Sequence, residues 1–332
     1  MLRSISRLNE LATRGHSAEH VPSDRPAGEL ELVYAFEKQM PVGFAFSRTG
    51  RLFVTYPRWE IPADFTLGEI ADGVEQPYPD AQLPSLSDDV ENHIISAQGI
   101  VIDAKDRLWV LDNASLDFAP AKAGGPKLLC FDLATNTICK KIVFDQNVVP
   151  ETSFLNDLRV DLSRGAEGTI YITDSGEKSS NGLIVVDIAT GRAIRRLANH
   201  RSVKAVDRYL GVVEGRPFQN HKRGQKPEPN KTGVDGIALE ADGSKVYYCA
   251  NADRRLYRVN ADALRNTEIS NSEVEFLVED LGEKGVSDGL GEDAAGNIYT
   301  TNYEHNAILR RAPEGTFTTV VHDPRPSGPI RS

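Results

Sequence analysis

The chain has 332 residues, 40% of them hydrophobic, and a formal net charge of −10 at pH 7. This acidic balance argues against a nucleic-acid-binding surface, which is typically basic. No stretch approaches 18 consecutive apolar residues, so the sequence predicts no membrane-spanning helix. We therefore expect neither nucleic acid nor membrane as a partner, and enough apolar residues for a large core.

The N-terminal residues 1–28 mix basic and acidic side chains and contain no sustained apolar run. A secretory signal needs an apolar run of roughly 7–15 residues. We expect residues 1–28 to be poorly ordered and the chain, as written, to be cytoplasmic. Residues 29–325 are predicted to form a single domain, and residues 326–332 a tail.

A unit of strand, polar turn and strand occurs five times along the domain. Each unit begins with a short apolar strand that contains a small or polar anchor residue, and its second strand is rich in β-branched and aromatic residues. Several units continue into a third and a fourth strand. Four short antiparallel strands make one blade of a β-propeller, and such blades must stack around an axis to bury both faces. The anchors are Gly43, Gly99, Asp157, Gly236 and Gly289.

The anchors are evenly spaced except for a longer interval between Asp157 and Gly236. That interval contains residues 201–232, which are rich in Lys, Arg, Pro, Asn and Gly and are predicted to form an inserted, solvated surface loop. A sixth anchor at the same spacing would fall beyond Ser332. The sequence thus predicts an all-β propeller with about five blades, either a five-bladed ring or a six-bladed one whose last blade is truncated.

Several motifs, in this order along the chain, resemble the yellow / major royal jelly protein family. They are Phe53-Val-Thr-Tyr-Pro-Arg-Trp59, Ala97-Gln-Gly-Ile-Val-Ile-Asp103, Tyr171-Ile-Thr-Asp-Ser175 and Gly233-Val-Asp-Gly-Ile-Ala238. The resemblance implies a six-bladed propeller, distantly similar to the senescence-marker and gluconolactonase propellers, and favours the truncated form. It also implies a mostly secreted family, whereas this chain shows no export signal.

The innermost strand of each blade brings the residue before its anchor to one mouth of the central channel. The loop after each second strand approaches the same mouth. We therefore expect a ligand site in this mouth, with Val42 as its apolar first-blade member. The predicted ligand-binding residues are Gln98, Asn156, Asp174, Asp235, Asn251, Asp288, Asn302 and Tyr303.

Three of these residues, Asn156, Asp235 and Asp288, offer the oxygen ligands that Ca²⁺ requires. The cofactor that the sequence suggests is therefore Ca²⁺. The alternative is that these residues begin strands and cap backbone amides in Asx-turns. The likeness to gluconolactonases implies a metal-binding Glu in the first blade. Val42 stands at that position, which weakens the lactonase hypothesis.

The family resemblance implies a small organic ligand, such as an aromatic amine or a catechol-like compound. Carboxylates beside aromatic faces would suit such a ligand. An isomerase activity similar to dopachrome conversion would need a base, for which His305 and Asp235 are the candidates. A metal-dependent lactonase acting on a lactone is one alternative, and a non-catalytic binding or scaffold protein is another.

The segment 56–59 carries Arg58 next to Trp59. We expect a packed loop here, in which the guanidinium group stacks on the indole ring, rather than a binding site.

Overall fold

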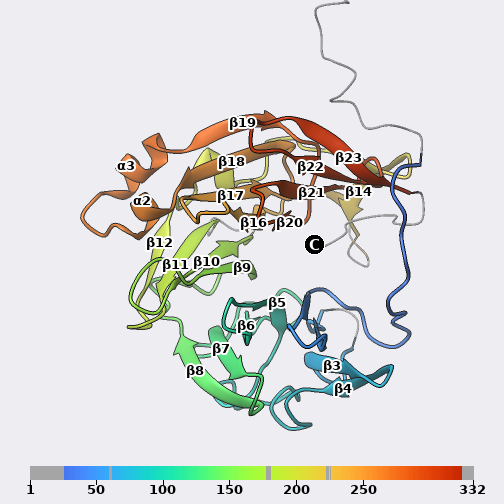
Figure 1. The fold of residues 1–332 in the computed structure, drawn as a ribbon, viewed down its shortest axis with the longest axis vertical. Coiled ribbons are helices and arrows are strands. Elements are labelled where there is room, and N and C mark those ends of the chain that lie inside the picture. The colour runs from blue at the N-terminus through green and yellow to red at the C-terminus, as the bar shows by residue number, and fades with distance from the viewer. Residues whose placement is uncertain (1–25, 60–61, 177–180, 222–223, 225, 324–332) are drawn as a thin grey trace, which may run out of the picture.

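The computed structural model describes residues 26–59, 62–176, 181–221, 224 and 226–323. Five four-stranded antiparallel sheets coincide with the five repeats, and in each sheet the strands neighbour one another in chain order. Figure 1 shows these sheets arranged around an arc as the blades of a β-propeller. The predicted all-β propeller fold is confirmed.

The blades are numbered here in chain order. Blade 1 contains β1 (Phe44–Phe46), β2 (Leu52–Thr55), β3 (Leu67–Ala71) and β4 (Val74–Pro77); blade 2 contains β5 (Ala97–Ile102), β6 (Arg107–Asp112), β7 (Lys127–Asp132) and β8 (Thr137–Val143). Blade 3 contains β9 (Leu155–Asp161), β10 (Thr169–Asp174), β11 (Gly182–Asp187) and β12 (Ala193–Arg196). Blade 4 contains β16 (Val234–Leu239), β17 (Lys245–Ala250), β18 (Arg255–Asn260) and β19 (Glu279–Glu283); blade 5 contains β20 (Leu290–Glu292), β21 (Ile298–Asn302), β22 (Ala307–Arg311) and β23 (Phe317–His322).

The described residues contain three short helical segments outside the blade strands. They are η2 (Arg201–Val203), α2 (Ala261–Arg265) and α3 (Asn271–Phe276). The last begins with a reciprocal capping box between Ser270 and Glu273, which satisfies backbone amides at the helix start. In the part of the chain that the structure describes, no helix has the length and apolar character needed to cross a membrane.

The hydrophobic core is divided among the interfaces between successive blades. One apolar cluster joins Tyr171 of blade 3 to Tyr248 of blade 4, and others join blades 1 and 2, blades 2 and 3, and blades 4 and 5. Central strands such as β10 and β17 are almost fully buried, whereas the outer strand β8 is mostly exposed. Stability therefore depends on each blade covering the face of the next.

The segment between blades 3 and 4 is not only a loop, which corrects the sequence prediction for residues 201–232. It forms a sixth, three-stranded sheet, β13 (Gly211–Val213), β14 (Arg216–Asn220) and β15 (Glu228–Pro229). This sheet does not separate blades 3 and 4, because β9 packs directly on β16. It instead covers one face of blades 4 and 5, where Phe218 packs against Tyr303. We call residues 209–220 the flap.

The arc of four-stranded blades is open between blade 5 and blade 1. Figure 1 shows the segment after Ala27 running along this open side from β23 toward blade 1. Ala27 pairs with His322 at the outer edge of blade 5, and Gln39 accepts a hydrogen bond from the backbone of Asp64 in blade 1. No four-stranded sheet among the described residues fills this sector. The expectation of five four-stranded blades therefore agrees with the structure.

Two phenylalanines on the inner strand β1 face this open sector. Phe44 is 50% exposed and Phe46 is 52% exposed, whereas Phe53 on the neighbouring strand β2 is fully buried. In a closed propeller an inner strand is covered by the next blade, so the exposure of these rings is a direct consequence of the opening.

Buried threonines link neighbouring blades through the second strand. Thr55 donates a hydrogen bond of 2.7 Å to the carbonyl of Gln98 in blade 2, and Thr173 donates one of 2.9 Å to the carbonyl of Asp235 in blade 4. Thr301 stands at the aligned position of blade 5 and accepts a bond from the backbone of Asp288. Within the described residues its hydroxyl reaches no following blade.

Replacing Thr173 by Val should destabilise the fold more than replacing Thr301 by Val. The first change removes the bond between blades 3 and 4 and leaves a buried carbonyl without a partner, which costs roughly 1–3 kcal/mol. The matched change Thr301→Val removes only a contact within its own blade. Urea unfolding of both variants checks this difference, and equal losses of stability would contradict the proposed linking role.

Replacing Phe46 by Ser should reduce binding of a hydrophobic dye while lowering the unfolding free energy by only about 1 kcal/mol or less, since the ring is already half exposed. The control is Phe53→Ala, which should cost about 3–5 kcal/mol because it empties a packed site. Dye fluorescence and thermal unfolding provide the two readouts. A loss of stability in Phe46→Ser as large as in the control would show that the ring is packed rather than exposed.

Candidate functional site

The residues just before the anchors are all buried. Gln98, Asn156 and Asp235 are the second residues of β5, β9 and β16, and Asp288 lies just before β20. Inner strands converge on the axis, so these polar side chains meet at one end of the channel. Val42 occupies the corresponding place in blade 1 and is apolar, as expected from the sequence.

Asn251 is the centre of a hydrogen-bond network that joins three of these positions. Its side-chain amide donates to Asp235 at 3.1 Å and to Asp288 at 2.7 Å. The amide of Asn156 also donates to Asp235, and the amide of Asn230 donates to the Asn251 oxygen at 2.6 Å. The four predicted residues are therefore brought together from blades 3, 4 and 5.

Sequence reasoning missed Asn230. It lies in the segment that was predicted to be a solvated loop, yet it is only 4% exposed. The available signal was its position close to Gly233, where the chain enters the innermost strand of blade 4.

Several buried polar atoms around this network have no hydrogen-bond partner among the described residues. They are both amide atoms of Gln98 and the side-chain oxygens of Asn156 and Asn302. A buried polar atom without a partner costs about 1–3 kcal/mol, so such atoms are few in native proteins and often mark a site for water, an ion or a ligand. Three of these four atoms are oxygens, so the mouth presents mainly acceptors.

Two further predicted residues are placed differently. Asp174 is fully buried, but its carboxylate accepts bonds from the backbone of Phe154 and Gly176 and from Arg195 at 2.7 Å. Through these contacts the Asp174 carboxylate stabilises the loops of blade 3. Tyr303 is 1% exposed and donates to the carbonyl of Asn251, and burial raises the pKa of its hydroxyl group, which therefore stays protonated.

The candidate base His305 is exposed on the turn after β21. Its backbone amide closes that turn on the carbonyl of Asn302. The buried carboxylate of Asp235 lies within the network, so of the two candidate bases only Asp235 is part of the converging polar residues.

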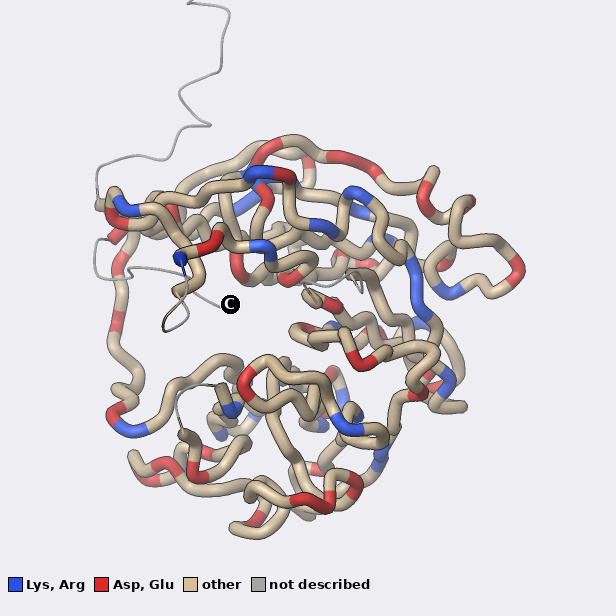
Figure 2. The backbone as a smooth tube through the Cα atoms, turned by 180° about the vertical axis from the view of Figure 1, so that it is seen from behind, with Lys and Arg blue, Asp and Glu red and all other residues tan. Residues whose placement is uncertain are grey.

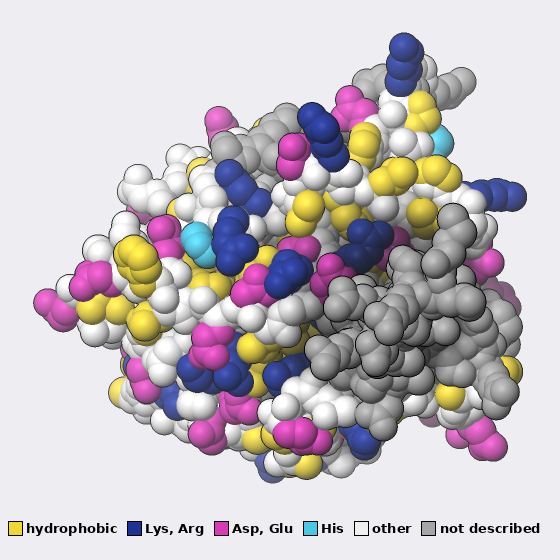
Figure 3. All heavy atoms as spheres, turned by 90° about the horizontal axis from the view of Figure 1, so that it is seen from above, with side chains coloured by type: hydrophobic (Ala, Val, Ile, Leu, Met, Phe, Trp, Pro, Cys, Tyr) yellow, Lys and Arg dark blue, Asp and Glu magenta, His cyan; other side chains and the backbone are white. Residues whose placement is uncertain are grey.

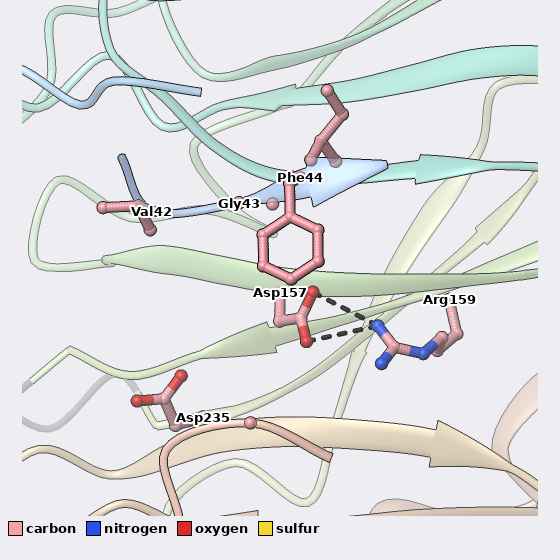
Figure 4. A pocket seen from close by; sticks show the side chains of 9 residues that line it. Val42, Gly43, Phe44, Asp157, Arg159 and Asp235 are labelled. Atoms are coloured by element: carbon pink, nitrogen blue, oxygen red, sulfur yellow. Dashed lines mark hydrogen bonds and ion pairs between the residues drawn. The ribbon is translucent and has the colours of Figure 1, made fainter. Parts of the chain in front are cut away.

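A pocket between the inner strands is lined by Phe44, Asp157 and Asp235, among others. Figure 4 shows the ring of Phe44 above the ion pair between Asp157 and Arg159, with Asp235 nearby. Arg159 pairs with Asp157 at 3.2 Å and reaches Glu292 of blade 5 at 3.0 Å. Neighbouring carboxylates raise the pKa of Arg159 against the opposing effect of burial, so this cross-channel link stays charged.

The flap is fastened over blades 4 and 5 beside the mouth. Glu304 accepts a bond from the backbone of Val212 at 2.9 Å and pairs with Arg254 at 2.7 Å. The hydroxyl group of Tyr209 in the flap lies 3.2 Å from that of Tyr303 in blade 5. The flap thus forms one wall of the mouth on the side of Asn251 and Tyr303.

The Arg58–Trp59 segment is packed, but not as predicted. Arg58 is buried and donates to the carbonyls of Ile94, Ile95 and Pro84. Trp59 stacks instead on the ring of Phe118, with a centroid distance of 5.3 Å. Burial lowers the pKa of Arg58, although the carboxylate of Asp112 opposes this effect.

Among the described residues, charged side chains of both signs occur on every blade. Figure 2 shows acidic and basic residues distributed over all the blades. On the face in Figure 3, the visible Lys and Arg side chains lie among Asp, Glu and hydrophobic side chains.

The fit to a metal rests on Asn156, Asp235 and Asp288. Two carboxylates and an amide oxygen suit Ca²⁺ by chemistry, and the oxygen of Asn156 is buried without a partner. Among the described residues no group of three or more His, Cys, Asp or Glu side chains is placed to hold a metal. The residues present therefore fit a calcium site only if amide oxygens and water complete the coordination.

Comparison with known proteins agrees with this architecture. Major royal jelly protein 1 of Apis mellifera is 26% identical over 68% of this chain and 51% of its own length. Yellow-related salivary protein SP04 of Phlebotomus argentipes is 28% identical over 68% of this chain and 57% of its own length. The chain thus spans about half the length of the curated relatives it matches.

Among solved structures, a luciferin-regenerating enzyme shares the fold, with a TM-score of 0.50 and 13% sequence identity, over 92% of this chain and 80% of that one. At this identity the likeness concerns the fold alone. The family model for major royal jelly protein matches residues 95–324, which is more than half of the chain. The chain belongs to the major royal jelly protein family.

Proposed function

We propose that this protein binds a small organic cation, an aromatic amine, in the mouth of its channel. The observation that carries the proposal is that Asn156, whose buried oxygen has no partner among the described residues, belongs to the same network as the carboxylates of Asp235 and Asp288. The oxygens of Gln98 and Asn302, at aligned positions of blades 2 and 5, likewise have no partner there. A primary ammonium group carries three N–H donors and a positive charge. It therefore complements a site that offers acceptors and negative charge.

The aromatic part of such a ligand would find apolar walls near the network. Phe218 of the flap packs against Tyr303 of blade 5, on the side of Asn251. An ammonium group close to the face of Tyr303 would gain an additional cation–π attraction. Binding requires only this pocket, whereas isomerisation would also require proton transfer, for which Asp235 is the better-placed carboxylate.

Replacing Asp235 or Asp288 by Asn should weaken the binding of tyramine at least tenfold, because a charge-assisted hydrogen bond is lost in a buried site. Isothermal titration calorimetry measures the affinity, and the uncharged analogue tyrosol tests the requirement for the ammonium group. Glu268→Gln, an exposed change with the same loss of charge, should leave the affinity unchanged. Equal affinity for tyramine and tyrosol would contradict the proposal.

A second candidate function is calcium-dependent hydrolysis of a lactone. It is supported by the single network that contains Asn156, Asp235 and Asp288. Calcium bound there would act as a Lewis acid on the lactone carbonyl. Val42 supplies no carboxylate from blade 1, which leaves this function second.

If the second candidate holds, calcium should bind wild-type protein and bind Asp235→Asn at least tenfold more weakly, because one of two charged ligands is removed. Calorimetry with CaCl₂ measures this, and hydrolysis of glucono-1,5-lactone with and without calcium tests the chemistry. Absence of calcium binding to wild type would exclude the lactonase proposal and leave the amine proposal standing.

A further inference from the structure

Three aromatic rings from three different blades form a continuous stack on the loop side of the molecule. Phe118, from the loop after β6, lies 5.3 Å from Trp59 at an interplanar angle of 28°. It lies 5.3 Å from Phe154 at 26° on its other contact. Trp59 and Phe154 make no ring contact with each other in the described part of the chain, and they approach Phe118 from blades 1 and 3, which pack on either side of blade 2.

The central ring of this stack is the exposed one. Phe118 is 59% exposed, whereas Trp59 and Phe154 are partly buried. A large apolar side chain held mainly in solvent contributes little to burial, so its position calls for another reason than core packing.

The loop that carries Phe118 has an unfavourable backbone. Ala114, Asp117 and Phe118 have φ angles of 53°, 49° and 59°, in the left-handed region that L residues rarely adopt. For a bulky residue such as Phe this conformation is a strained outlier, and strain of this kind concentrates at ligand sites and switch regions.

A small set of hydrogen bonds holds the strained loop against its neighbours. The backbone of Asp117 donates to the carbonyl of Arg58 at 3.1 Å, and the hydroxyl of Ser115 donates to the carbonyl of Ala119 at 2.8 Å. Phe118 itself is retained chiefly by its two stacking contacts. Withdrawal of its ring would therefore break those two stacking contacts.

One of the two flanking rings, that of Trp59, carries a polar group without a partner among the described residues. The indole N–H of Trp59 is buried without a hydrogen-bond acceptor in the described residues. Phe118 offers no acceptor, so the present occupant of the space leaves this donor unsatisfied.

We propose that Trp59 and Phe154 form an aromatic clamp for a planar ring, and that Phe118 fills this clamp in the ligand-free protein. The ligand is a planar aromatic molecule with a hydrogen-bond acceptor at its edge. Its ring replaces Phe118 between the two flanking rings, and its acceptor receives the indole N–H. This clamp is separate from the ammonium site at Asp235 and does not depend on it.

The test uses quinoline, a planar aromatic molecule that is uncharged at pH 7.5 and carries one acceptor nitrogen. Phe118→Ala should increase the affinity for quinoline at least fivefold, because the competing side chain is removed. Trp59→Ala and Phe154→Ala should each reduce it at least tenfold. Phe276→Ala, at a ring that is 90% exposed outside the stack, should leave it unchanged.

Calorimetry gives these affinities, and circular dichroism with thermal unfolding confirms that each variant is folded. Trp109 is the other tryptophan of the chain and is fully buried, so Trp109→Phe makes the fluorescence of Trp59 a specific reporter of ring replacement. Should Trp109→Phe fail to fold, the calorimetric series on the wild-type background decides alone.

Weaker or unchanged quinoline binding in Phe118→Ala would overturn the proposal, because Phe118 would then be part of a fixed surface. Unchanged binding in both Trp59→Ala and Phe154→Ala would overturn it as well. Loss of tyramine binding in Asp235→Asn with quinoline binding retained would support two separate sites.

Discussion

The close approach of neighbouring inner strands is the constraint on which the rest of the structure depends. A side chain at Gly99 would place its Cβ 2.7 Å from the backbone oxygen of Asn156, and one at Gly236 would place it 2.9 Å from that of Asp288. Only glycine fits at these two points, where one blade rests against the next. This contact sets the depth of each inner strand in the ring, and it carries the preceding residues, Gln98 and Asp235, to the mouth.

The same constraint explains why polar groups are buried at the mouth. Once Asn156, Asp235 and Asp288 converge on the axis, their side chains take part in one hydrogen-bond network with Asn251. Asn251 and Asn230 satisfy part of this demand, but the oxygens of Asn156 and Asn302 stay unpartnered in the described residues. A binding site with unmet acceptors is the physical basis for the proposed recognition of an ammonium group.

Features that follow the repeat could be predicted from the sequence. The five anchors predict five four-stranded blades, and the residues before them predict which polar side chains are buried together. The position of Asp174 at the end of its strand could also be predicted. Its ion pair could not, because Arg195 reaches the carboxylate from another strand of the folded blade. Such ion pairs depend on three-dimensional packing and produce no periodic pattern in the sequence.

Features that break the repeat were the least predictable. In the sheet between blades 3 and 4, strands β14 and β15 are mostly exposed and polar in composition, as is typical of a solvated loop, so they gave no hydrophobic alternation to detect. The stack of Trp59, Phe118 and Phe154 is assembled from three loops of different length. The three residues do not stand at aligned positions of the repeat. The indole of Trp59 therefore contacts Phe118 rather than the adjacent guanidinium group of Arg58.

The central claim is that the polar network at the channel mouth binds an ammonium group. A crystal structure of the protein in complex with tyramine tests it most directly. The account predicts the ligand nitrogen within hydrogen-bonding distance of Asp235 or Asp288, with the oxygen of Asn156 or Asn302 as a further acceptor. A ligand bound elsewhere, with only water molecules on these oxygens, would contradict it.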